Sequence, residues 1–173
     1  MSDEQIIGYT VAYEQGELPF LVYVLLFIAI ALFAAGWVHS IALLMPLSLV
    51  PAAGVYYSLP LLETGKPRLG AGQYGLFLEG LGLVQWRAID GLDLVTTYVR
   101  GTPFQELHVP LKSALGEALL LDWRRRPLAR QFMRLPWSLC APKVIRIPLD
   151  ILDKPPAEIH AKLQAMWRYY RGQ

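Results

Sequence analysis

The side chains best suited to binding chemistry are gathered in one basic segment, residues 124–134. Its arginines are Arg124, Arg125, Arg126, Arg130 and Arg134. Apolar residues lie between them, and such a mixture suits an anionic membrane surface, where each basic residue contributes about 1 kcal/mol. We therefore predict that this segment contacts anionic lipid headgroups or a protein partner. The alternative is a solvated loop whose arginines satisfy the positive-inside rule or pair with Asp122, Asp150 and Asp153.

Residue types that support catalysis or metal binding form no motif in this sequence. The histidines His39, His108 and His160 are scattered and lack metal-ligand spacing. Neither a glycine-rich phosphate loop nor a nucleophile elbow is present. Cys140 is the single cysteine, which fits a reducing compartment, and we interpret it as a small apolar filler. We expect no catalytic residue, no cofactor, no metal and, without a recognisable motif, no nucleic-acid partner.

The elements that position the basic segment begin with a long uncharged stretch. Between Glu17 and Glu63 there is no Asp, Glu, Lys or Arg, and all 16 Lys and Arg residues follow Glu63. A single bilayer span needs about 20 apolar residues. Residues 18–62 therefore predict a transmembrane helical hairpin with spans at about 18–38 and 41–62. Three prolines in the second span, Pro46, Pro51 and Pro60, predict that this helix is kinked.

Charge on either side of the hairpin predicts its orientation. Residues 1–17 contain four acidic and no basic residues, whereas the chain from Glu63 onward has 16 basic against 10 acidic residues. The turn between the spans has no Lys or Arg, and Lys66 and Arg68 follow the second span closely. Because basic residues near span ends stay in the cytoplasm, we predict a multi-pass protein of the bacterial inner (plasma) membrane with both termini cytoplasmic.

Residues 63–173 predict a small β-domain closed by a helix. Short runs of alternating apolar residues separated by turn residues predict strands at 75–79, 83–87, 94–100, 104–109, 118–123 and 144–147. Such a series indicates an antiparallel β-sandwich or a partly open barrel. Residues 155–171 have the period of an amphipathic helix, which we expect to cap the domain. The alternation in residues 7–13, inside the N-terminal segment 1–17, predicts either another strand or an amphipathic surface segment. The fold class is therefore α+β.

One strand–turn–strand unit resembles a known family. It runs from Gly75 through a glycine turn to Trp86 and Ile89, which are its main anchors. This unit, with the hairpin before it and the helix after it, resembles the small bacterial two-span membrane proteins that carry a pleckstrin-homology-like domain. The resemblance implies a pleckstrin-homology-like fold over residues 63–173, and many domains of this shape are binding or scaffold modules without chemistry of their own.

Together these features predict a non-enzymatic binding or scaffold protein of the inner membrane, which presents its β-domain at the cytoplasmic face. We expect its partners to be the lipid bilayer, anionic lipid headgroups, and a protein partner or a second copy of the chain, as in an accessory subunit of a membrane complex. The alternative is a lipid-handling or transport-associated component, an enzyme or transporter subunit that uses residues 124–134.

Overall fold

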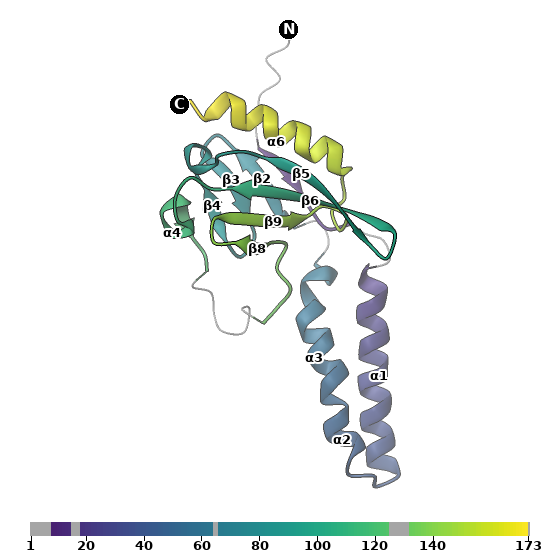
Figure 1. The fold of residues 1–173 in the computed structure, drawn as a ribbon. Helices are drawn as coiled ribbons and strands as arrows, with labels where there is room; N and C mark the ends of the chain where they lie inside the picture. Colours follow the sequence, from purple (N-terminus) through teal and green to yellow (C-terminus); the bar gives the residue numbers. More distant parts are fainter. Residues whose placement is uncertain (1–7, 15–17, 64–65, 125–131, 173) are drawn as a thin grey trace. The chain divides into compact units, whose positions relative to one another are not determined.

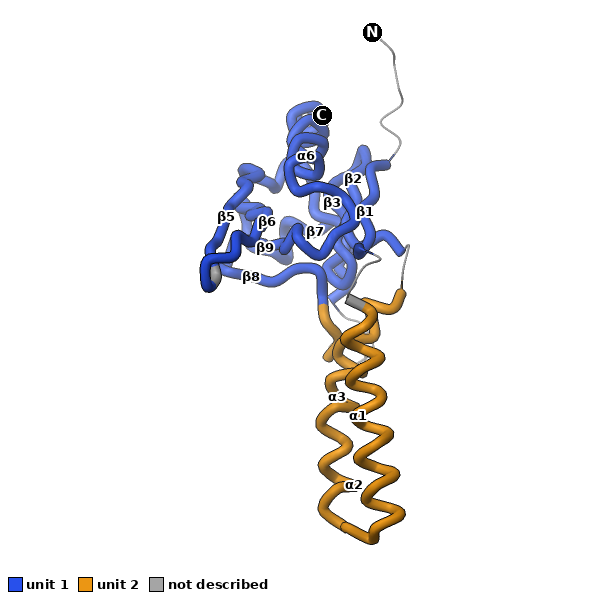
Figure 2. Tube along the Cα trace, turned by 90° about the vertical axis from the view of Figure 1, so that its right-hand side faces the viewer, with its two compact units in different colours: residues 1–14, 65–126, 135–173 blue, residues 15–64, 127–134 orange. Residues whose placement is uncertain are grey.

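A computed structural model of the chain describes residues 8–14, 18–63, 66–124 and 132–172, and Figure 1 shows their helices and strands. The chain divides into two compact units, coloured separately in Figure 2. Unit 1 comprises residues 1–14, 65–126 and 135–173, and unit 2 comprises residues 15–64 and 127–134. Unit 1 is a β-domain, and unit 2 is built mainly from a helical hairpin.

The hairpin of unit 2 pairs one continuous helix with one interrupted helix. Its first arm is α1 (Leu18–Val38), and its second arm consists of α2 (Leu44–Leu47), α3 (Leu49–Ser58) and the 3₁₀ helix η1 (Leu59–Leu62). α1 packs against α2, α3 and η1. The runs Pro19–Val38 and Leu44–Leu62 are long and apolar enough to cross a membrane. Many of their large apolar side chains are exposed, including Phe27 and Trp37 of α1.

Small residues allow the two arms of the hairpin to pack closely. A Cβ atom on Gly36 would come within 3.1 Å of Leu44, and one on Gly54 within 3.3 Å of Leu25. The second arm is broken at Ser48, whose hydroxyl donates to the Met45 carbonyl oxygen at 2.6 Å. Proline lacks the backbone donor that a continuous helix requires, so this interruption and the 3₁₀ ending agree with the kinks that the three prolines predict.

Unit 1 contains two antiparallel sheets. The five-stranded sheet has the order β1 (Tyr9–Val11), β2 (Leu69–Gly72), β3 (Gly75–Leu78), β4 (Gly82–Val84) and β7 (Leu119–Asp122). The four-stranded sheet has the order β5 (Asp93–Val99), β6 (Thr102–Pro110), β9 (Val144–Pro148) and β8 (Ser138–Ala141). In the described residues the two sheets do not close into one barrel.

Helix α6 (Pro156–Tyr170) contacts both sheets (Figure 1). It packs against β2 of the five-stranded sheet, against β5 and β6 of the four-stranded sheet, and against the short 3₁₀ helix η2 (Trp86–Ala88). Its buried face consists of Ile159, Leu163 and Met166. The inward positions of the strands supply the rest of the core, with Leu69, Leu76, Leu78, Val84, Leu107, Val109, Ile145 and Ile147 fully buried. Alternation in the strands and helical spacing in α6 thus converge on one apolar interior.

The α+β class, with two apolar helices, antiparallel sheets and a C-terminal helix, is confirmed. The strand predicted at 83–87 is too long, because β4 ends at Val84 and the chain turns into η2. Strand β2 was not expected, since its sequence Leu-Gly-Ala-Gly lacks alternation, and neither was β8. A further helical turn, α4 (Leu115–Ala118), precedes β7.

The segment before the first span belongs to the β-domain. β1 pairs antiparallel with β2, with Thr10 opposite Gly70. Beyond β1, Glu14 donates its backbone N–H to the Ile151 carbonyl at 3.0 Å, and Asp153 donates to the Ala12 carbonyl at 3.0 Å. These bonds resolve the two interpretations of residues 7–13 in favour of a strand for Tyr9–Val11.

Candidate functional site

Most of the predicted basic contact segment lies outside the described residues. This is the case for Arg125, Arg126 and Arg130. Arg124 belongs to unit 1 and Arg134 to unit 2. Contact of this segment with anionic lipid or with a partner therefore stays a prediction.

Arg124 is held by a neighbouring carboxylate. Its Nε and Nη2 atoms donate to the two Asp122 carboxylate oxygens at 2.9 and 2.7 Å, and its backbone N–H donates to the same side chain at 2.9 Å. The hydrogen bonds that its guanidinium donates to Asp122 raise the pKa of Arg124 above its ordinary value. For this arginine, the structure matches the pairing with Asp122 that was the alternative to membrane contact. Arg134 uses its backbone N–H to donate to the Tyr57 carbonyl at 2.9 Å.

The other residues singled out from the sequence are dispersed. Cys140 is exposed on β8, so its interpretation as an apolar filler is wrong. His108 lies beside Glu106 on β6, and His160 is 3.0 Å from the Leu92 carbonyl oxygen. His39 is exposed beside the turn of the hairpin. In the described residues, no three His, Cys, Asp or Glu side chains are grouped to hold a metal ion.

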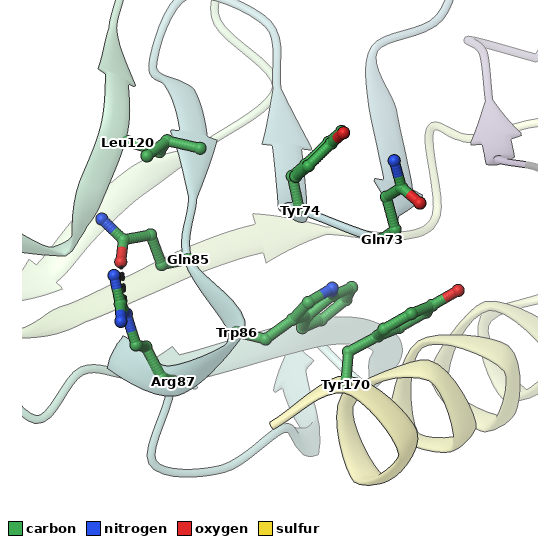
Figure 3. A pocket seen from close by; sticks show the side chains of 7 residues that line it. All are labelled: Gln73, Tyr74, Gln85, Trp86, Arg87, Leu120 and Tyr170. Carbon is green, nitrogen blue, oxygen red and sulfur yellow. Dashed lines mark hydrogen bonds between the residues drawn. The ribbon is translucent and has the colours of Figure 1, made fainter. Parts of the chain in front are cut away.

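A pocket of about 300 Å³ lies in unit 1 where the β2–β3 turn, η2, β7 and the end of α6 meet. It is lined by Gln73, Tyr74, Gln85, Trp86, Arg87, Leu120 and Tyr170. Figure 3 shows the rings of Trp86 and Tyr170 on one side, Gln73 and Tyr74 opposite them, and the Gln85–Arg87 pair at one end. Ligand pockets typically range from about 300 to 1,000 Å³, so this one is of a size for a small group.

Two hydrogen bonds made by tryptophan side chains fix the walls of the pocket. Trp86 is 3% exposed, and its indole nitrogen donates to the Gly72 carbonyl at 2.7 Å, which fastens η2 to the end of β2. Trp167 of α6 donates to the Ile89 carbonyl at 3.3 Å, which holds the end of α6, and with it Tyr170, near η2. The two anchors of the family resemblance, Trp86 and Ile89, thus both position this pocket.

Arg87 provides the positive charge of the pocket. Its Nε donates to the Gln85 side-chain oxygen at 2.7 Å, which orients the guanidinium. The two terminal nitrogens of this exposed side chain have no bonding partner among the described residues, and no acidic side chain lines the pocket. The pocket therefore combines aromatic walls, neutral amides and one oriented cation.

A second hollow, of about 260 Å³, lies on the outer face of the five-stranded sheet and shares Tyr74 with the pocket. It is floored by glycines of β2 and β3 and walled by Tyr9, Phe77 and Leu83. A Cβ on Gly70 would lie 3.5 Å from the Phe77 ring, and one on Gly72 would meet nothing within 4 Å. The absence of side chains on these glycines is what opens the hollow.

This hollow continues into an apolar row across the sheet. The strand register places Gly70 opposite Phe77, Phe77 opposite Leu83, and Leu83 opposite Leu121. Leu121 is 51% exposed, and Trp123 packs its ring edge-on to Phe77 with centroids 5.4 Å apart. We call this row, together with the hollow, the apolar face; contiguous exposed apolar surface of this kind is characteristic of binding sites.

No sequence pattern brings the residues of the pocket together. The pocket residues come from a turn, a 3₁₀ helix, a strand and the last turn of a distant helix, and only Trp86 had been singled out. The spacing Gly70, Gly72 and Gly75 in two adjacent strands is the one signal that points to the hollow, because glycine within a strand often marks a place of close approach.

No protein-family model, curated protein or solved structure matches the chain.

Proposed function

We propose that this protein is a non-enzymatic binding or scaffold module of the bacterial inner membrane, which presents its β-domain at the cytoplasmic face. Its two spans would hold the domain beside the bilayer, and the domain would bind another subunit of a membrane complex. The pleckstrin-homology-like assignment is part of this proposal. It is supported by the two antiparallel sheets with a C-terminal helix and by the Trp86–Ile89 corner.

The observation that carries the proposal is the apolar face. Its central residues, Phe77, Leu83 and Leu121, lie in register on three neighbouring strands of the five-stranded sheet. Interfaces are anchored by buried aromatic and aliphatic side chains that enter pockets, and this face offers both apolar side chains and an adjoining hollow. The apolar face is therefore suited to bind a protein partner through apolar contacts and complementary shape.

The test compares what remains bound to the full-length protein after crosslinking in native membranes. Leu121→Asp places a charge on the apolar face, and Gly72→Val fills the hollow. The matched control is Leu139→Asp, because Leu139 also lies on an edge strand and is 47% exposed, close to the 51% of Leu121. We expect a protein partner that is retained by wild type and Leu139→Asp and lost from the other two variants.

Equal capture by all four proteins would contradict the assignment of the apolar face. Recovery of bound lipid with no protein partner would favour the lipid-handling alternative instead.

A further inference from the structure

The pocket beside Trp86 has the composition of a site for one particular class of ligand. We propose that it binds a carboxylate joined to a planar apolar group, with the carboxylate on Arg87 and the planar group between Tyr74, Trp86 and Tyr170. This inference rests on the proposed binding function and names the chemistry that the site recognises.

The charge of the ligand follows from Arg87. Arginine recognises carboxylates through two parallel N–H donors, and the bond from Nε to Gln85 leaves the two terminal nitrogens to act in this way. A single cation suits a single negative charge. A cationic ligand would meet Arg87 with no acidic side chain in the lining to compensate it.

The shape of the ligand follows from the aromatic walls. Trp86 lines the pocket, and its indole N–H is already donated to the Gly72 carbonyl, so it offers no free donor to a ligand. Tyr170 and Tyr74 add two further rings. Aromatic side chains prefer offset or edge-on contact with another ring, which favours a flat apolar group over a branched one.

The carboxylate can have two sources, a free aromatic acid or the C-terminus of a polypeptide that ends in an aromatic residue. The hollow of the apolar face shares Tyr74 with the pocket. A polypeptide could therefore place its last side chain and carboxylate in the pocket while its preceding residues lie along the hollow.

The test titrates the full-length protein in lipid nanodiscs by calorimetry, with empty nanodiscs subtracted. The free-acid probe is 2-naphthoate, and the polypeptide probe is acetyl-Ala-Ala-Phe with a free carboxylate. The amides of both probes and 2-naphthylmethylammonium have matching shapes without the negative charge. Arg87→Gln removes the cation of the pocket, and Arg168→Gln is the matched control on an exposed position outside the lining.

We expect at least one acid to bind to wild type and Arg168→Gln, and to lose about tenfold or more in affinity in Arg87→Gln, as for the loss of a charge-assisted hydrogen bond. The amides should bind as weakly as the acids bind to Arg87→Gln. Stronger binding of the peptide supports the polypeptide source, and stronger binding of naphthoate supports the free acid.

Binding that is equal in wild type and Arg87→Gln, absent for both acids, or strongest for the ammonium probe would overturn the ligand class. These outcomes differ from failure of the proposed function. That function fails if partner capture is insensitive to Leu121→Asp and Gly72→Val, which do not alter Arg87, or if bound lipid is recovered with no protein partner.

Discussion

The guanidinium of Arg68 donates a hydrogen bond to the carboxylate of Glu79 inside unit 1. The Arg68 side chain is completely buried, and that of Glu79 is 18% exposed. The Tyr13 ring lies against the same guanidinium, 4.8 Å from its centroid to Cζ. Tyr13 precedes the first arm of the hairpin and Arg68 follows the second, so this cluster joins the two segments of unit 1 that lead into and out of the apolar helices.

Replacing Glu79 with glutamine should destabilise unit 1 strongly. The change removes a negative charge from beside a buried guanidinium, and breaking a buried pair in this way costs about 3 kcal/mol or more. The double variant Arg68→Met/Glu79→Leu should recover most of this loss, because neither charge then remains buried. The free energy of unfolding, measured by denaturant titration of the full chain in micelles, checks both expectations.

A matched control for this experiment is Asp122→Asn, which breaks the exposed ion pair with Arg124. The two side chains of that pair are 38% and 40% exposed, and exposed pairs contribute about 1 kcal/mol or less. A loss in Glu79→Gln no larger than in Asp122→Asn would show that the Arg68–Glu79 pair is energetically like a surface pair.

Tyr9 should make the stability of unit 1 fall in strong alkali. Burial, together with the nearby carboxylates of Glu158 and Asp153, raises the pKa of Tyr9 from 10.0 to about 12. The folded protein therefore holds this proton more tightly than the unfolded chain does, so the stabilisation is complete below pH 10 and disappears as the pH rises through about 12. Tyr9→Phe keeps the ring, over which the Lys154 ammonium lies at 4.2 Å, and removes the titrating group.

The measurement is the free energy of unfolding at about pH 9 and about pH 11.5 for wild type and Tyr9→Phe. Wild type should lose more stability over this interval than the variant does. Other tyrosines and lysines titrate in both proteins, so only the difference between them reports on Tyr9. Parallel losses would contradict the assigned pKa.

The sequence was sufficient for those parts of the fold that carry a periodic or compositional signal. The uncharged stretch between Glu17 and Glu63 located both apolar helices. Alternation located β3, β5, β6, β7 and β9 within one or two residues. Strand β2 was missed because its outward positions are glycines, which open the hollow but erase the alternation. The pocket was missed because its lining residues, from Gln73 to Tyr170, are brought together only by tertiary contacts such as the bond from Trp167 to Ile89.

Cys140 can test the predicted orientation of the hairpin. It is the single cysteine of the chain and is exposed on the edge strand β8 of unit 1. If the β-domain lies in the cytoplasm, an impermeant maleimide should fail to label Cys140 in intact cells or spheroplasts and should label it after permeabilisation. Cys140→Ser provides the background. Labelling of intact spheroplasts at the level of permeabilised ones would reverse the assigned topology.

Substitution by valine should lower the stability of unit 1 at one glycine of the five-stranded sheet and leave it unchanged or slightly higher at another. Gly82 has a φ of +118°, and a Cβ there would lie 1.9 Å from the Leu121 carbonyl oxygen. Gly82→Val should therefore destabilise unit 1 by about 3 kcal/mol, from backbone strain and a clash that the neighbouring strand cannot relieve. A Cβ on Gly72 meets nothing within 4 Å, so Gly72→Val should fold with unchanged or slightly higher stability, because valine favours strands and restricts the unfolded chain.

Thermal unfolding of the two variants beside wild type measures this contrast. The outcome also decides whether Gly72→Val is a fair probe of partner binding, since a variant that fills the hollow is informative only while the domain stays folded. If Gly72→Val lost as much stability as Gly82→Val, the hollow would be a structural requirement of the sheet. If it retains wild-type stability and loses the partner, the space above Gly72 is part of the binding surface.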